Sequence, residues 1–181
     1  MKTAYLDYQA STPLDPRVRA EMLAAFDAPG NASAEEHSFG WAAAKLLDES
    51  RSAVAATLNA QPGEIVFTSG ATEANNIAIL GAAASAPPGR RRILISALEH
   101  KSVREAAYAA EALGFRAEII PTNSKGIVEI KALSDRVDKT VAVVSIMAVN
   151  NEIGTLQPVR ELAAVAPVSY THLTLPTNRE V

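Results

Sequence analysis

Short apolar runs alternate with helix-like segments between residues 64 and 166, and this alternation limits the fold of the chain more than any other feature. The strand-like runs cover residues 64–68, 92–96, 117–120 and 140–147, and the helix-like segments cover 70–84, 102–113, 129–137 and 158–166. The last run is apolar almost throughout, as expected for a strand buried on both faces. Strands and helices alternate with the spacing typical of βαβ units, which predicts an α/β fold with a largely parallel sheet and flanking helices.

The first sixty residues contain two predicted helices. Asp15 and Pro16 are typical of a helix start, and apolar residues at helical spacing continue to Phe26. A break around Pro29 and Gly30 separates this helix from a second one over residues 40–58. We expect residues 1–60 to form an N-terminal arm with helices, packed on the main domain or on a partner subunit, and residues 61–167 to form that domain.

The last fourteen residues, 168–181, differ in amino-acid composition from the rest of the chain. Threonines and polar stretches replace the pattern rich in Ala, Glu and Arg, with neither a helical nor a strand period. One interpretation is a short exposed terminus. The interpretation that we favour is a non-native tail, left where a reading frame crosses a junction.

Composition excludes several classes of function. The net charge of −3 argues against a nucleic-acid-binding surface, and the absence of cysteine excludes a disulfide scaffold, a zinc thiolate site and a cysteine nucleophile in this chain. The three histidines, His37, His100 and His172, match no metal-ligand spacing, so we expect no metal. No secretory leader or apolar run long enough for a bilayer is present, which predicts a cytoplasmic protein without membrane contact.

A candidate phosphate site lies between the run 64–68 and the helix predicted after it. The first turn of a helix has unpaired N–H groups and partial positive charge. Gly70 would let a ligand approach the backbone there, and the Thr72 hydroxyl would add a donor. The spacing is neither that of a dinucleotide fingerprint nor that of a P-loop, and a plain capped helix start is the alternative interpretation.

Two further polar segments follow predicted strands at their carboxyl ends, where open α/β sheets bind ligands. In Glu99–Lys101, His100 could stack on a flat heterocycle or move a proton, or it could simply be an exposed residue at a helix start. In Asn150–Gly154, an amide could bind an oxygen substituent without adding charge, or the segment could be an ordinary Asn-Gly turn. The convergence of the three segments predicts one shared site.

Five segments in order closely resemble the cysteine desulfurases, pyridoxal-phosphate enzymes of fold type I and of the class V aminotransferase family. They are YLDYQASTP (Tyr5–Pro13), HSFGW (His37–Trp41), EIVFTSGATEANN (Glu64–Asn76), EHK (Glu99–Lys101) and SIMAVNNEIGTLQP (Ser145–Pro158). The resemblance covers residues 1–167. It implies that residues 61–167 are part of the pyridoxal-phosphate-binding large domain, and that the complete protein is a homodimer.

The resemblance also implies roles for four residues. Ala71 and Thr72 match the positions that hold the phosphate of pyridoxal 5'-phosphate, by backbone N–H and hydroxyl. His100 matches the catalytic histidine that stacks on the pyridine ring and assists proton transfer. Asn151 matches the amide that binds the phenolic oxygen of the ring. The substrate implied is L-cysteine, with a sulfur-acceptor or iron–sulfur scaffold protein as partner.

Residues that the family needs for turnover do not occur in this sequence. None of its lysines lies in the Ser-x-His-Lys context of the Schiff-base lysine, and the chain has no cysteine to form the persulfide. We therefore expect an N-terminal fragment that is inactive by itself.

Two other functions remain open from the sequence. A selenocysteine lyase or another class V lyase would share these motifs, and its downstream cysteine loop would differ. A non-catalytic α/β module or scaffold that binds a phosphate-bearing ligand at Gly70–Thr72 is the alternative of a different class.

Overall fold

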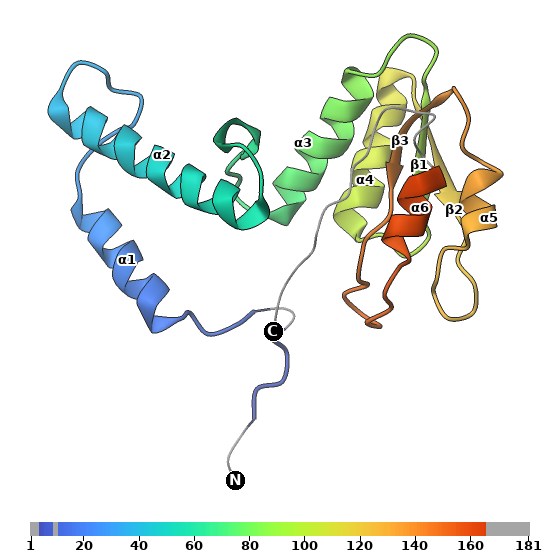
Figure 1. Ribbon diagram of the computed structural model, residues 1–181, viewed down its shortest axis with the longest axis horizontal. Helices are drawn as coiled ribbons and strands as arrows, with labels where there is room; N and C mark the ends of the chain where they lie inside the picture. The colour runs from blue at the N-terminus through green and yellow to red at the C-terminus, as the bar shows by residue number, and fades with distance from the viewer. Residues whose placement is uncertain (1–3, 9–10, 166–181) are drawn as a thin grey trace. The chain divides into compact units, whose positions relative to one another are not determined.

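The computed structural model describes residues 4–8 and 11–165, and these fall into two compact units (Figure 1). The units are Met1–Phe67 and Thr68–Val181. We expected the boundary between the arm and the main domain after residue 60, which is seven residues before the boundary between these two units. The tail predicted over 168–181 lies outside the described residues.

The first unit contains two α-helices and a short 3-10 helix: α1 (Pro16–Asp27), α2 (Ser38–Leu58) and η1 (Pro62–Glu64). Asp15 caps α1, because its carboxylate accepts the Arg17 N–H at 2.8 Å. His37 caps α2 in the same way, with Nδ1 accepting the Gly40 N–H at 3.1 Å. Asn59 ends α2 in the left-handed conformation, as helix C-termini often require.

Apolar side chains of α1 and α2 remain exposed. No residue of α1 is buried, and Phe26 is 78% exposed. The exposed apolar side chains of the two helices include Val18, Met22, Leu23, Phe26, Leu46, Leu47, Val54 and Leu58. These are the stripes that the sequence assigns to packing on another surface.

The second unit alternates helices and strands as predicted, and the α/β fold with a parallel sheet is confirmed. Its elements are α3 (Ala71–Ala84), β1 (Arg92–Ser96), α4 (Lys101–Ala109), η2 (Ala110–Leu113), β2 (Arg116–Ile120), α5 (Ile130–Ser134), β3 (Val141–Ser145) and α6 (Val159–Val165). The strand order is β2-β1-β3, and both pairings are parallel.

Helices flank the sheet on both sides (Figure 1), and the central strand β1 is buried on both faces. Ile93 and Ile95 lie in one apolar cluster with side chains of α3 and α4. Leu94 points to the opposite face and lies in a second cluster with side chains of α5 and α6. All three are fully buried, which explains why the strands read as continuous apolar runs.

The strand predicted over residues 64–68 is wrong. Glu64 ends η1, and the residues after it form no strand ladder with any other part of the described chain. Val66 is 66% exposed, and the Ile65 carbonyl accepts a hydrogen bond from the Arg51 guanidinium. A β-branched run becomes a strand only beside a partner, and the strands β2, β1 and β3 pair only with one another in the described chain.

The register of β1 and β2 offers a matched pair of substitutions. Ile95 is fully buried, whereas its partner Ile119 is 41% exposed. We expect Ile95→Ala to lower the free energy of unfolding by about 2–5 kcal/mol, because it leaves a cavity in the core. Ile119→Ala should lower the free energy of unfolding clearly less, because this side chain is partly exposed. Urea unfolding followed by circular dichroism measures both, and equal losses would contradict the assigned core.

Candidate functional site

The first turn of α3 is open to a ligand. Gly70 precedes it with φ of 157° and ψ of −179°, a region that only glycine occupies readily. A Cβ at Gly70 would meet no heavy atom within 4 Å, so there is free space beside the backbone. The N-cap residue Gly70 has no side chain that could cap the helix, so the N–H groups of Ala71 and Thr72 remain available.

Neighbouring hydrogen bonds hold the shape of this loop. The Glu73 carboxylate accepts the Ser69 N–H at 2.6 Å and the Ser69 hydroxyl at 2.7 Å. These two donors hold the pKa of Glu73 below its ordinary value. The Thr72 hydroxyl has no hydrogen-bond partner in the described part of the chain. An anion at this helix start would find backbone donors, a free hydroxyl and the positive end of the helix dipole.

His100 is the N-cap residue of α4 and is exposed. Its Nδ1 accepts the Ser102 N–H at 3.1 Å and lies 2.8 Å from the Ser102 hydroxyl oxygen. Ser102 also accepts a hydrogen bond from the Asn75 amide nitrogen at 2.7 Å. Because Asn75 belongs to the second turn of α3, this bond links the start of α3 to His100.

Asn151 lies in the turn after β3 and is exposed. The buried side chain of Asn150 shapes that turn, since its Oδ1 accepts the N–H groups of Glu152 and Ile153, each at 2.9 Å. The sequence directs attention to the exposed amide, and the structure shows that its buried neighbour orders the backbone around it.

Two hydrogen bonds connect the loop after β1 with the segment after β3. Asn150 Nδ2 donates to the Leu98 carbonyl at 3.1 Å, and Glu99 Oε1 accepts the Met147 N–H at 2.5 Å. Because β1 and β3 are adjacent and parallel, their carboxyl ends meet at the same edge of the sheet. His100 follows Glu99 and Asn151 follows Asn150, so these bonds place the two predicted site residues on connected segments.

Glu99 is 6% exposed and ionisable. Burial raises its pKa to about 7, and the hydrogen bond from Met147 opposes that shift only in part. The carboxyl group of Glu99 therefore changes its charge near neutral pH, directly beside His100.

The donor set fits pyridoxal 5'-phosphate. The start of α3 offers donors to a phosphate, with the open space beside Gly70 as the structural observation that permits it. His100 supplies a flat ring, and Asn151 supplies a neutral amide for an oxygen substituent. Ala71, Thr72, His100 and Asn151 all belong to the second unit.

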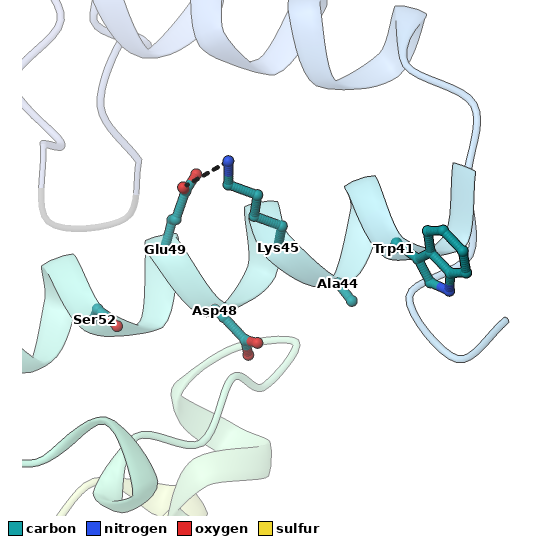
Figure 2. Close-up of a pocket in the computed structure, with 6 residues that line it drawn as sticks. All are labelled: Trp41, Ala44, Lys45, Asp48, Glu49 and Ser52. Carbon is teal, nitrogen blue, oxygen red and sulfur yellow. Dashed lines mark ion pairs between the residues drawn. The ribbon is translucent and has the colours of Figure 1, made fainter. Parts of the chain in front are cut away.

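A separate hollow lies along one face of α2 in the first unit (Figure 2). Its lining residues are Trp41, Ala44, Lys45, Asp48, Glu49 and Ser52. Lys45 and Glu49 form an exposed ion pair at 3.7 Å, one helical turn apart. None of the predicted site residues lines this hollow.

The described residues contain no group of three or more His, Asp or Glu side chains arranged to hold a metal ion. Among the helices described, none is long and apolar enough to cross a membrane.

Comparison with known proteins gives a family and several relatives. The family model for class-V aminotransferases matches residues 4–174. The cysteine desulfurase IscS of Rickettsia felis is 43% identical over 162 residues, and that of Rickettsia bellii is 41% identical. Each alignment covers 89% of this chain and 40% of the relative. The chain thus spans about two-fifths of the length of these curated relatives.

Solved structures give the same result. A NifS-like protein superposes with a TM-score of 0.85 at 34% identity, covering 93% of this chain and 46% of its own. SspA in complex with cysteine gives 0.82 at 34% identity, with coverages of 90% and 47%. DndA from Streptomyces lividans gives 0.74 at 40% identity, with coverages of 89% and 45%. The resemblance to cysteine desulfurases that the sequence motifs indicate is confirmed.

The burial of Glu99 predicts a dependence of stability on pH. The folded chain keeps this proton up to about pH 7, whereas the unfolded chain releases it from about pH 4.5. The folded state then binds more protons, so the free energy of unfolding falls as the pH rises through this interval, by about 3 kcal/mol in total. Glu99→Gln keeps an acceptor for the Met147 N–H and removes the titration.

Urea unfolding of both proteins at pH 4.5 and pH 7.5 measures this contribution. The stability of the original chain relative to the Gln variant should decrease between the two pH values. Equal changes in the two proteins would show that Glu99 is not buried as the structure has it.

Proposed function

This chain belongs to the class-V aminotransferase family, and we propose that it is the N-terminal portion of a cysteine desulfurase. The observation that supports this most strongly is the linked placement of the α3 start, His100 and Asn151. The Asn75–Ser102 hydrogen bond connects the first two, and the Asn150–Leu98 hydrogen bond connects the loops after β1 and β3.

The cofactor of the proposed enzyme is pyridoxal 5'-phosphate, which supplies an electron sink for carbanion chemistry when bound. Ala71 and Thr72 would hold its phosphate through backbone N–H groups and the free hydroxyl. Asn151 would bind an oxygen substituent of the ring. His100 would lie against the ring and take part in proton transfer as the catalytic residue of this segment.

The proposed reaction converts L-cysteine into L-alanine and passes the sulfur atom to a cysteine of the enzyme as a persulfide. This chain contains no cysteine, so the accepting thiol belongs to another part of the complete protein. The role of the present segment is to bind and orient the cofactor, and we expect no sulfide release from this chain alone.

We extend the proposal to partners. The complete protein would be a cytoplasmic homodimer that delivers sulfur to an acceptor or scaffold protein for iron–sulfur cluster assembly. The relatives named IscS support the pathway, and the exposed apolar side chains of α1 and α2 support a further surface that covers them.

Substitution of Thr72 tests the phosphate site. In the full-length protein, Thr72→Ala should raise the Kd for pyridoxal 5'-phosphate roughly 10-fold or more, because a hydrogen bond to a charged group is lost. The matched control is Thr57→Ala, since the Thr57 hydroxyl is exposed on α2 and bonds only to the Ala53 carbonyl. Absorption of the bound cofactor measures both, and inorganic phosphate should compete.

Alanine formation from L-cysteine by the full-length protein tests the activity. Turnover of selenocysteine with little turnover of cysteine would indicate a selenocysteine lyase instead. Cofactor binding without either reaction would replace the enzyme by a binding module.

A further inference from the structure

Among the described residues, only one of the two imidazole nitrogens of His100 has hydrogen-bond partners. Nδ1 accepts the Ser102 N–H at 3.1 Å, and the Ser102 hydroxyl oxygen lies 2.8 Å from the same atom. Nε2 has no hydrogen-bond partner within the part of the chain that the structure describes. A nitrogen that accepts a backbone N–H cannot carry a proton itself, so in its contact with the Ser102 hydroxyl Nδ1 accepts and the hydroxyl donates.

Asn75 leaves the Ser102 hydroxyl hydrogen free for that bond. Its amide nitrogen is a donor only, and it lies 2.7 Å from the Ser102 hydroxyl oxygen. The Ser102 oxygen therefore accepts from Asn75, and its own hydrogen remains available for a second partner. That partner is His100 Nδ1, which then accepts from both the N–H and the hydroxyl of Ser102.

We infer that Asn75 and Ser102 are positioning residues that fix His100 as the tautomer with its proton on Nε2. Asn75 and Ser102 are 9% and 7% exposed, so water competes little for the hydrogen bonds of their side chains. The N–H of Nε2 is left on the exposed edge of the ring, available to an acceptor atom of a ligand.

This inference deepens the proposed function and, where it concerns the ligand, rests on it. Neutral His100 would offer a hydrogen-bond donor to an oxygen atom of the bound cofactor or substrate. To accept a proton it would have to use Nδ1 and give up both bonds from Ser102, including the one that caps α4. In the absence of a proton transfer, the exposed nitrogen Nε2 of His100 is thus a hydrogen-bond donor.

Nitrogen NMR of the imidazole tests the tautomer without any assay of activity. The chain has three histidines, so labelling with 15N-histidine gives three ring systems to assign. At about pH 8.5, two units above the ordinary histidine value, long-range 1H–15N spectra distinguish protonated from unprotonated ring nitrogens. We expect His100 to show a protonated Nε2 and an unprotonated Nδ1 in the folded chain.

Three substitutions test the cause. Ser102→Ala removes the hydroxyl donor, and Asn75→Asp replaces the amide donor by an acceptor that draws the hydroxyl away from Nδ1. Each should lower the ratio of the Nε2–H tautomer to the Nδ1–H tautomer by roughly 2- to 10-fold. Ser102→Thr keeps the hydroxyl and should restore the ratio. Ser134→Ala is the matched control, because its hydroxyl bonds to the Lys131 carbonyl far from His100 in sequence.

The outcomes separate this inference from the proposed function. A protonated Nδ1 in the original chain, or an unchanged ratio in both Ser102→Ala and Asn75→Asp, would overturn the inference whatever the protein binds. The expected tautomer in a full-length protein that fails to bind pyridoxal 5'-phosphate would support the inference and refute the proposed function. If Asn75→Asp fails to fold, Ser102→Ala and Ser102→Thr decide the question alone.

Discussion

Parallel pairing of β1 with β3 is the constraint on which the site depends. Parallel strands end at the same edge of a sheet, so the segments after β1 and β3 meet although about fifty residues separate them in sequence. The apolar clusters on both faces keep β1 in that register. His100 and Asn151 can therefore stay exposed and polar, because the buried strands bring their two segments together.

Hydrogen bonds of buried polar side chains then fix how the segments after β1 and β3 lie against each other. Glu99 and Asn150 are buried immediately before the exposed His100 and Asn151, and each bonds to the opposite segment. A buried polar group without its partner costs about 1–3 kcal/mol, so each of these bonds resists a shift of the loops. The same pattern occurs at Ser102, which joins α3 to α4. The exposed residues of the predicted site are thus supported by buried side chains whose hydrogen bonds are satisfied.

Much of this could be predicted from the sequence, for physical reasons that differ between elements. The strands β1 and β3 follow from apolar runs, because burial on both faces imposes that composition, whereas in β2 only Ile120 is buried. The run 64–68 has the same composition and forms no strand, since a strand also needs a neighbour, and sequence does not show which edges are free. Thr72, His100 and the segment 150–154 could be named from their places after predicted elements, whereas Ala71 and Asn151 follow only from the resemblance to the family, and the roles of all four residues stay predictions. Glu99 and Asn75 could not be given roles, because their partners lie 48 and 27 residues away.

The direction of a hydrogen bond carries information that a contact map lacks. The Ser102 N–H can only donate, so His100 Nδ1 carries no proton and accepts from the Ser102 hydroxyl as well. The amide nitrogen of Asn75 donates to the same hydroxyl oxygen and leaves its hydrogen free for that bond. An aspartate at position 75 would have nearly the same shape and would reverse its bond with Ser102. The chemistry available at the exposed nitrogen is therefore supported by a buried side chain, and packing alone would not distinguish the two residues.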